Sequence, residues 1–247
     1  MGKRRFEVIL FDLGDTLIYF DGDWTEIFFQ AHQALLRSLQ GLGLSLEPGF
    51  IDDYRERLEV YYRERDTEFI EYTALFLLKK TLADWEQTDI PETSLIKALA
   101  DMYAVTQAHW IPELDALPTL RLLVEQGYRL GLVSNAADDA NTQALVDKLG
   151  ARPFFDVIIS SAAIGVRKPN PKIFWKALEQ MKTPPSQSVM VGDKLGADIL
   201  GARHAHIFSI WITRRANTPG NRDHLDTIFP DASAATLAEI PGLLRSI

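Results

Sequence analysis

Five short apolar runs set the strongest limit on what this chain can fold into. Each run lacks a clean alternation of apolar and polar residues, ends abruptly in small or polar residues, and is followed by a helix-like pattern. Runs of this kind are typical of strands that are buried on both faces of a parallel sheet. The five runs are Phe6–Phe11, Arg129–Val133, Val157–Ile159, Ser188–Val191 and Phe208–Ile212.

The segments between these runs carry the signals of helices. Two of them end at a glycine, the residue favoured just after a helix, and Asn170 with Pro171 forms an N-cap and first-turn pair ahead of a third. Strand–helix alternation predicts an α/β fold, with a doubly wound, mostly parallel sheet in a three-layer α/β/α core. The expected helices are Asp115–Gln126, Asp138–Leu149, Ile173–Met181 and Gly196–Ala205.

The stretch over residues 21–111 differs, because it has helical patterns and no strand-like run. Asp23 and Glu26 have the spacing of a capping box that opens a helix reaching about Gln40. We therefore expect an all-helical cap domain at 21–111, inserted into a core formed by residues 1–20 and 112–247. Its further helices are expected over Pro48–Arg65, Glu68–Leu82 and Pro91–His109.

Charge and composition argue against several classes of protein. The chain has 247 residues, no cysteine and a formal net charge of -8. That charge argues against broad contact with nucleic acid or anionic lipid, and the missing cysteines exclude disulfides and thiolate metal sites. The basic start, Met1–Arg5, superficially resembles a signal peptide, but the apolar stretch behind it is too short for export or for a membrane span. We expect a cytoplasmic monomer or homodimer.

Polar residues follow four of the expected strands. Because ligands bind at the carboxyl ends of the strands in an open parallel sheet, we expect these residues to meet. They are Asp12, Gly14, Asp15 and Thr16 after the first strand, Ser134 and Asn135 after the second, Lys168 after the third, and Asp193 and Asp198 after the fourth.

In this order and spacing, the four segments resemble the four motifs of the haloacid dehalogenase-like hydrolases. The resemblance covers about Phe6 to Ile212, and the helical insertion after the first motif looks like the C1-type cap of that superfamily. It implies a magnesium-dependent phosphatase that acts on a small phosphorylated metabolite. In that reaction Asp12 would attack the phosphoryl group, and water would hydrolyse the resulting aspartyl-phosphate.

The resemblance also implies a metal site made of oxygen ligands, which suit Mg²⁺. The cation would be held by the Asp12 carboxylate, by the Gly14 carbonyl and by Asp193, with Asp198 in or near this set.

A second implied group binds and activates the phosphoryl group. Ser134 would donate its hydroxyl and Asn135 its backbone N–H to phosphoryl oxygens. Lys168 would neutralise charge between the nucleophile and the phosphoryl group. Thr16 would support the turn that holds Asp12.

The first motif departs from the family pattern at Gly14. The usual phosphatase has an aspartate there, which protonates the leaving oxygen and then activates water, a contribution of about 10²–10⁴-fold. Here the aspartate falls one place later, at Asp15, and a shift of one residue re-aims a side chain.

Three explanations of Gly14 stay open. In the first, Asp15 reaches the site in place of the usual acid. In the second, a cap residue or water substitutes for that acid, or the leaving group needs little protonation. In the third, the protein binds metal and phosphate with little or no catalysis. A 2-haloacid dehalogenase, which needs no metal, is a further alternative. The sequence does not identify the substrate or the cap residues that contact it.

Overall fold

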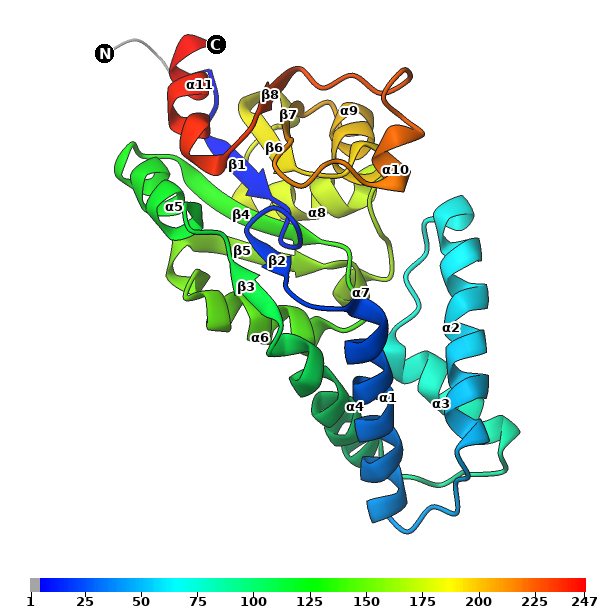
Figure 1. The fold of residues 1–247 in the computed structure, drawn as a ribbon. Helices are drawn as coiled ribbons and strands as arrows, with labels where there is room; N and C mark the ends of the chain where they lie inside the picture. Colours follow the sequence, from blue (N-terminus) through cyan, green and yellow to red (C-terminus); the bar gives the residue numbers. More distant parts are fainter. Residues whose placement is uncertain (1–4) are drawn as a thin grey trace.

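Within residues 5–247, which the computed structural model describes, six parallel strands form one sheet in the order β5-β4-β1-β6-β7-β8 (Figure 1). The basic start of the chain, residues 1–4, lies outside the described residues. The predicted α/β fold class is confirmed, and all five apolar runs coincide with strands. The strands are β1 Val8–Phe11, β4 Arg129–Ser134, β5 Phe155–Ser160, β6 Ser188–Gly192, β7 Phe208–Ile212 and β8 Ala232–Ala234.

Helices cover both faces of this sheet, because successive side chains of each strand point to opposite sides. Ile9 and Phe11 of β1 lie in a core with α5, α6 and α11, whereas Val8 and Leu10 lie in a second core with α8 and α9. The edge strand β8 was not predicted, since three residues carry too little pattern. These helices are α5 Ala116–Glu125, α6 Asp139–Leu149, α8 Pro171–Met181, α9 Leu200–His204 and α11 Ile240–Ser246.

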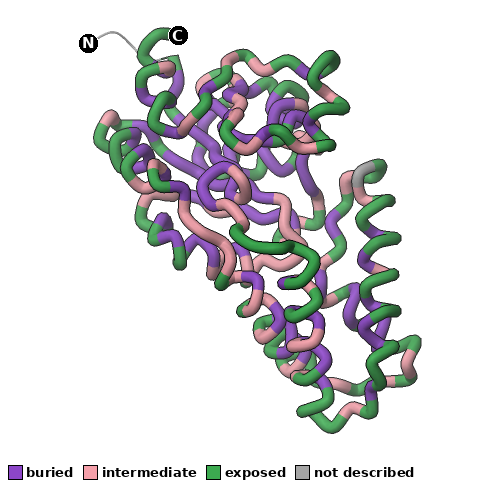
Figure 2. The backbone as a smooth tube through the Cα atoms, in the orientation of Figure 1, coloured by how far each residue is buried: buried purple, intermediate pink, exposed green. Residues whose placement is uncertain are grey.

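Four helices between β2 (Ile18–Phe20) and β3 (Trp110–Pro112) pack around a separate apolar core and form the cap (Figures 1 and 2). Asp23 caps the first of them by accepting a hydrogen bond from Glu26 N at 2.9 Å, as the sequence predicts. The helices are α1 Trp24–Gly41, α2 Gly49–Glu68, α3 Ala74–Asp84 and α4 Glu92–Gln107.

Two expectations for the cap region were wrong. Trp110 and Ile111 belong to β3 (Trp110–Pro112), which pairs antiparallel with β2 (Ile18–Phe20), so the region is not purely helical. Residues 69–73 are not helical either: Thr73 caps α3 by accepting from Phe76 N, and Ile70 bridges to Val166 of the core. Three-residue strands and a loop that pairs with a distant segment leave no periodic signal in the sequence.

The remaining elements are short. The expected helix over Gly196–Ala205 is instead one π-helical turn followed by α9. Nothing among the helices of residues 5–247 is both long and apolar enough to cross a bilayer. The short elements are α7 Ser161–Ile164, α10 Pro219–Arg222, the π-turn η3 Leu195–Ile199, and the 3₁₀ turns η1 Arg152–Phe154, η2 Pro185–Gln187 and η4 Leu237–Glu239.

Candidate active site

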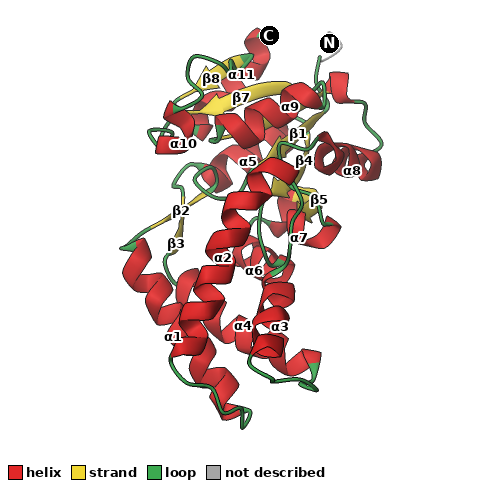
Figure 3. Cartoon of the chain, turned by 90° about the vertical axis from the view of Figure 1, so that its right-hand side faces the viewer, coloured by secondary structure: helices red, strands yellow, loops and turns green. Residues whose placement is uncertain are grey.

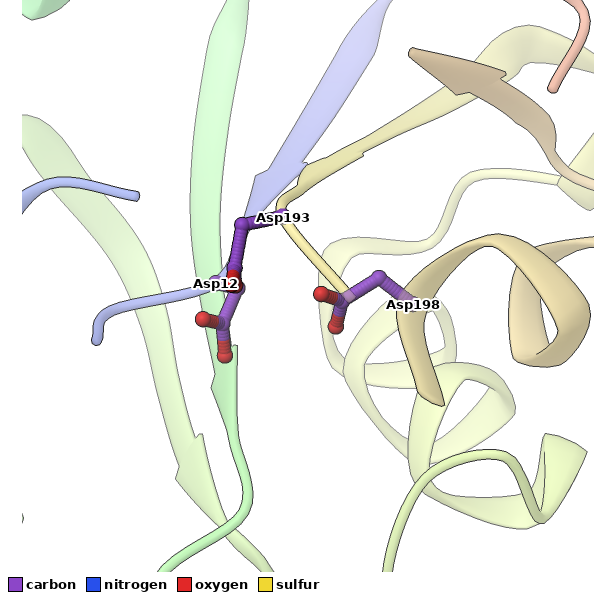
Figure 4. Close-up of side chains that lie close together, drawn as sticks. All are labelled: Asp12, Asp193 and Asp198. Carbon is purple, nitrogen blue, oxygen red and sulfur yellow. The ribbon is translucent and has the colours of Figure 1, made fainter. Parts of the chain in front are cut away.

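Three aspartates, one from the segment after β1 and two from the segment after β6, meet at the carboxyl ends of these strands (Figure 4). One carboxylate oxygen from each of Asp12, Asp193 and Asp198 lies within 4.8 Å of the others. Asp12 follows β1 and its N–H donates to Val191 O at 2.9 Å, which ties the loop to the neighbouring strand β6. All three side chains are buried, with residue exposures of 7%, 0% and 1%. The parallel sheet therefore brings together acids that are up to 186 residues apart in sequence (198 minus 12).

Lys168 supplies the positive charge beside these acids. Its Nζ donates to Asp12 Oδ1 at 2.6 Å, to Asp198 Oδ1 at 2.6 Å and to Val133 O at 2.8 Å, so all three protons of the ammonium have acceptors. Burial disfavours the charge, but the two aspartates more than offset this, and the pKa of Lys168 is raised. The lysine therefore stays charged and fixes two of the three carboxylates.

The segment after β6 brings Asp198 back to the site by a π-turn, a feature often found at functional positions. Lys194 N donates to Asp198 Oδ2 at 2.9 Å. The turn passes so close to the strand that a Cβ added at Gly192 would lie 2.4 Å from Asp198 Cγ. Only glycine fits at position 192 without displacing Asp198, which gives the Gly-Asp pair of the fourth motif a steric reason.

Two observations fit this group of carboxylates to a divalent cation. Asp193 Oδ2 is buried and has no hydrogen-bond partner within residues 5–247, and a buried carboxylate oxygen is normally paired or bound to a metal. Burial also raises the pKa of Asp193 well above its ordinary value, and the nearby charges of Asp198 and Asp12 raise it further. Oxygen donors of this kind suit Mg²⁺.

The structure gives the following contacts and positions for the other residues expected after the strands. Thr16 Oγ1 is 3.5 Å from Asp193 Oδ1, at the outer limit of a hydrogen bond. Ser134 is the buried last residue of β4. The side chain of Asn135 joins the second and third motifs, because its Oδ1 accepts from Lys168 N at 2.8 Å and its Nδ2 donates to Lys168 O at 3.0 Å. This tie through the side chain was not expected from the sequence.

Gly14 and Asp15 have different backbone conformations. Asp15 is left-handed, with φ of 58°, a region where aspartate is tolerated and glycine is unstrained. A Cβ added at Gly14 would make an ordinary contact with the Trp110 ring, at 3.4 Å. Burial raises the pKa of Asp15, which is half-buried; Lys194 opposes the shift and Asp12 adds to it. The Asp15 carboxylate is not part of the group formed by the three buried aspartates.

Sequence reasoning missed the residues that hold the backbone of Asp193. Asn221 Nδ2 donates to Asp193 O at 2.8 Å and its Oδ1 accepts from Leu195 N at 2.8 Å, while Trp211 Nε1 donates to Asp193 O at 2.8 Å. The sequence assigns no role in the site to the stretch containing Asn221. No motif marks a lone asparagine in the short helix α10, so its burial in the fold was needed to find it.

Lys194 was also missed, although its place next to Asp193 was a usable signal. The surrounding protein disfavours its charge, but Asp193, Asp12 and Asp15 more than offset this, so the pKa of Lys194 is raised. Its side chain remains exposed. An exposed ammonium beside a buried acidic group is suited to attracting an anion.

Two solved structures share this fold over nearly the whole chain. A 2-haloacid dehalogenase from Pseudomonas syringae matches with a TM-score of 0.68 and 24% identity, over 98% of this chain and 99% of that one. A phosphatase of the haloacid dehalogenase-like type from Thermococcus onnurineus matches with a TM-score of 0.62 and 24% identity, over 97% and 98%.

Relatives in sequence cover the chain equally well. The glyceraldehyde 3-phosphate phosphatase of Methanopyrus kandleri is 34% identical over 98% of both chains. The pyrimidine 5′-nucleotidase of Escherichia coli is 27% identical over 92% of this chain and 96% of its own length. The family described as haloacid dehalogenase-like hydrolase matches residues 6–206. With the four motifs assembled at one edge of the sheet, the chain belongs to the haloacid dehalogenase-like hydrolases.

Proposed function

We propose that this hydrolase is a Mg²⁺-dependent phosphatase that uses Asp12 as its nucleophile. One observation carries the proposal: the Lys168 ammonium holds Asp12 and Asp198 at 2.6 Å each, while the neighbouring Asp193 keeps a buried oxygen without a partner. Such a site holds the proposed nucleophile, Asp12, and the charged Lys168 in fixed positions. The negative charge of its carboxylates can also bind a metal cation. Transfer of a phosphoryl group needs this combination, because charge on its equatorial oxygens must be neutralised.

The proposed reaction has two steps. A carboxylate oxygen of Asp12 forms a bond to phosphorus while the bond from phosphorus to the leaving oxygen breaks, and that oxygen takes a proton from Asp15 or from water. Water then attacks the phosphorus of the aspartyl-phosphate, which releases inorganic phosphate and restores the Asp12 carboxylate. Lys168, charged and buried, would stabilise the negative charge in both steps.

Mg²⁺ would be held by Asp12, Asp193 and the Gly14 carbonyl, with Asp198 beside them. When bound, it supplies positive charge to the phosphoryl oxygens and orients them toward the nucleophile. Ser134 and the backbone of Asn135 would bind the same oxygens from the end of β4. Asn221 and Trp211 would keep the Asp193 peptide in one orientation, since both donate to its carbonyl oxygen.

The relatives support a small phosphorylated metabolite as the substrate. The relative at 34% identity is described as a glyceraldehyde 3-phosphate phosphatase, and the one at 27% as a pyrimidine 5′-nucleotidase. We therefore propose a phosphorylated three-carbon sugar as the first substrate class, with nucleotides as the second. The cytoplasmic location and the monomeric or dimeric state stay predictions, as does the cap boundary at residues 21–111.

The test is turnover of four substrates with and without Mg²⁺: glyceraldehyde 3-phosphate, a pyrimidine nucleotide, an aryl phosphate and acetyl phosphate. We expect Mg²⁺-dependent release of phosphate, and a loss of about 10³-fold or more in Asp12→Asn. Asp21→Asn, which changes an exposed carboxylate on the same segment, is the matched control and should keep full activity. Equal turnover in Asp12→Asn and the wild type would rule out the nucleophile.

A second candidate, a phosphate- and metal-binding protein with little catalysis, is favoured by Gly14 alone. It predicts Mg²⁺ and phosphate binding by the wild type with no turnover of any of the four substrates. A 2-haloacid dehalogenase has less support, because a group of three buried carboxylates is not needed for metal-free chemistry. Release of chloride from 2-chloropropionate, with no release from the phosphorylated substrates, would favour it instead.

A further inference from the structure

The loop between α2 and α3 (residues 69–73) is the part of the cap that pairs with the third-motif segment of the core. Glu71 N donates to Gly165 O at 3.1 Å, Arg167 N donates to Phe69 O at 3.1 Å, and Ile70 forms an antiparallel bridge with Val166. In Figure 3 the chain between α2 and α3 passes α7 on its way down to α3. The cap is therefore joined by backbone hydrogen bonds to the core segment that immediately precedes Lys168.

Glu71 carries a buried carboxylate across this contact, with 1% of its side chain exposed. Its Oε1 accepts from the hydroxyl of Tyr61 on α2 at 2.6 Å, and its Oε2 accepts from the hydroxyl of Ser161 on α7 at 2.7 Å. The Arg167 guanidinium lies 3.4 Å from Oε2. A buried carboxylate is tolerated only where such partners surround it, so this arrangement suits one docked position of the cap.

The partners of Glu71 lead directly to the segments proposed to bind the phosphoryl group. The Ser161 hydroxyl accepts from Ala136 N at 2.9 Å, and residue 136 follows Asn135. Arg167 precedes Lys168, whose backbone is tied to the Asn135 side chain by two hydrogen bonds. The Glu71 carboxylate of the cap is therefore linked to both the second and the third motif. The link lies close to the hydrogen bonds that join these two motifs to each other.

We propose that Glu71 is a positioning residue, through which the docked cap fixes segments 134–136 and 167–168 for phosphoryl binding. The inference rests on the proposed function, because it assigns those segments their role. Glu71 does not touch the reacting atoms. When the cap undocks, Glu71, Ser161 and Arg167 become hydrated and the two segments lose their common partner. Complete assembly of the phosphoryl site therefore follows cap docking.

The experiment compares Glu71→Gln with Glu92→Gln, which changes an exposed cap glutamate that pairs with Lys79. Turnover and the inhibition constant of inorganic phosphate are measured per folded molecule, well below the melting temperature. We expect Glu71→Gln to lower kcat and to weaken phosphate inhibition, each by about tenfold to a hundredfold, since small misplacements in a site have effects of this size. Glu92→Gln should change neither.

Amide hydrogen exchange supplies a readout that does not depend on activity. We expect faster exchange in segments 134–137 and 165–168 of Glu71→Gln, with no change in the distant strand β7. Wild-type kcat and wild-type phosphate inhibition in Glu71→Gln would overturn the inference. If the wild type has no turnover and binds no phosphate, the proposed function is wrong, and hydrogen exchange alone tests the role of Glu71. Unchanged exchange at 134–137 in Glu71→Gln would then overturn the coupling between the docked cap and this segment. Faster exchange there would support it.

Ser161→Ala keeps the test decisive if Glu71→Gln does not fold. This variant removes the hydroxyl between Glu71 and Ala136 and leaves the pair of Glu71 with Arg167 in place. We expect the same direction of change, about threefold to tenfold, within the usual range of coupling between contacting residues. Wild-type phosphate inhibition and wild-type exchange at 134–137 in Ser161→Ala would overturn the inference.

Discussion

The α/β core and the helical cap differ in how many charged side chains they bury. In the core, Lys168, Asp12 and Asp198 are buried together at the end of the parallel strands. In the cap, charges pair at exposed positions such as Lys79 with Glu92, and such pairs contribute little. Among the described cap residues, Glu71 is the only buried carboxylate, and its partners lead into the core. Within residues 5–247, four of the five buried acidic side chains therefore belong to the candidate site or to its extension into the cap, and the fifth, Glu113, pairs with Arg214 and Arg215 instead.

The largest effect is expected from the double variant Gly14→Asp, Asp15→Gly, which exchanges the order of two core residues next to the buried acids. The backbone permits it, because a Cβ at Gly14 makes an ordinary contact with Trp110 and glycine is unstrained at the left-handed position 15. With the usual acid restored, we expect turnover of an alkyl phosphate to rise about tenfold or more, with little change for acetyl phosphate. A fall in alkyl phosphate turnover would instead identify Asp15 as the working acid.

A smaller effect is expected from Asn221→Ala, which removes a hydrogen bond to the Asp193 carbonyl from the C-terminal part of the core. We expect the Mg²⁺ concentration for half-maximal activity to rise about tenfold, as is usual for residues that support a metal ligand. Binding of Mn²⁺, measured by its spin resonance signal, should weaken in parallel. Asn217→Ala, at an exposed position just before α10, is the control. Equal Mn²⁺ affinity in the wild type and in Asn221→Ala would show that Asn221 does not support metal binding.

Lys194→Met tests whether an exposed core charge also serves the site. Because Lys194 lies next to Asp193 and is exposed, we expect it to attract the anionic substrate rather than to act in the chemical step. The variant should raise KM about fivefold, with a smaller change in kcat, and the difference should shrink in high salt. Lys176→Met, on the outer face of α8, should leave KM unchanged. A KM effect that persists in high salt would indicate a direct structural role instead.

The smallest effect concerns the cap and changes stability alone. Burial, with Arg55 adding to it, lowers the pKa of His32 to about 4. The unfolded chain binds this proton near the ordinary value of 6.5, so the stabilisation is present above that pH and is lost as the pH falls toward 4. We expect a loss of about 1 kcal/mol between about pH 7 and 5.5 in urea unfolding. His32→Leu should lose less than the wild type over this range, and equal losses would contradict the assignment.

The sequence was most informative where the fold leaves few choices. Strands buried on both faces predict the parallel sheet, and the ends of such strands share one edge, so the sequence alone groups Asp12, Lys168 and Asp193. Asn221 could not be found in this way, because its contact with Asp193 depends on how the chain beyond β7 folds back over the end of β6. The role of Glu71 could not be predicted for a similar reason: its two partners in the core lie 90 and 96 residues further along the chain (161 and 167 minus 71).

The lack of space for a side chain at Gly192 limits which positions of this fold can change during evolution. Any side chain there displaces Asp198, and with it a partner of Lys168, so every single substitution at this position disturbs the surroundings of Asp12. We therefore expect related chains that keep the proposed reaction to keep glycine at this position. New specificities are then expected from exposed positions of the cap helices, where a substitution displaces no buried partner.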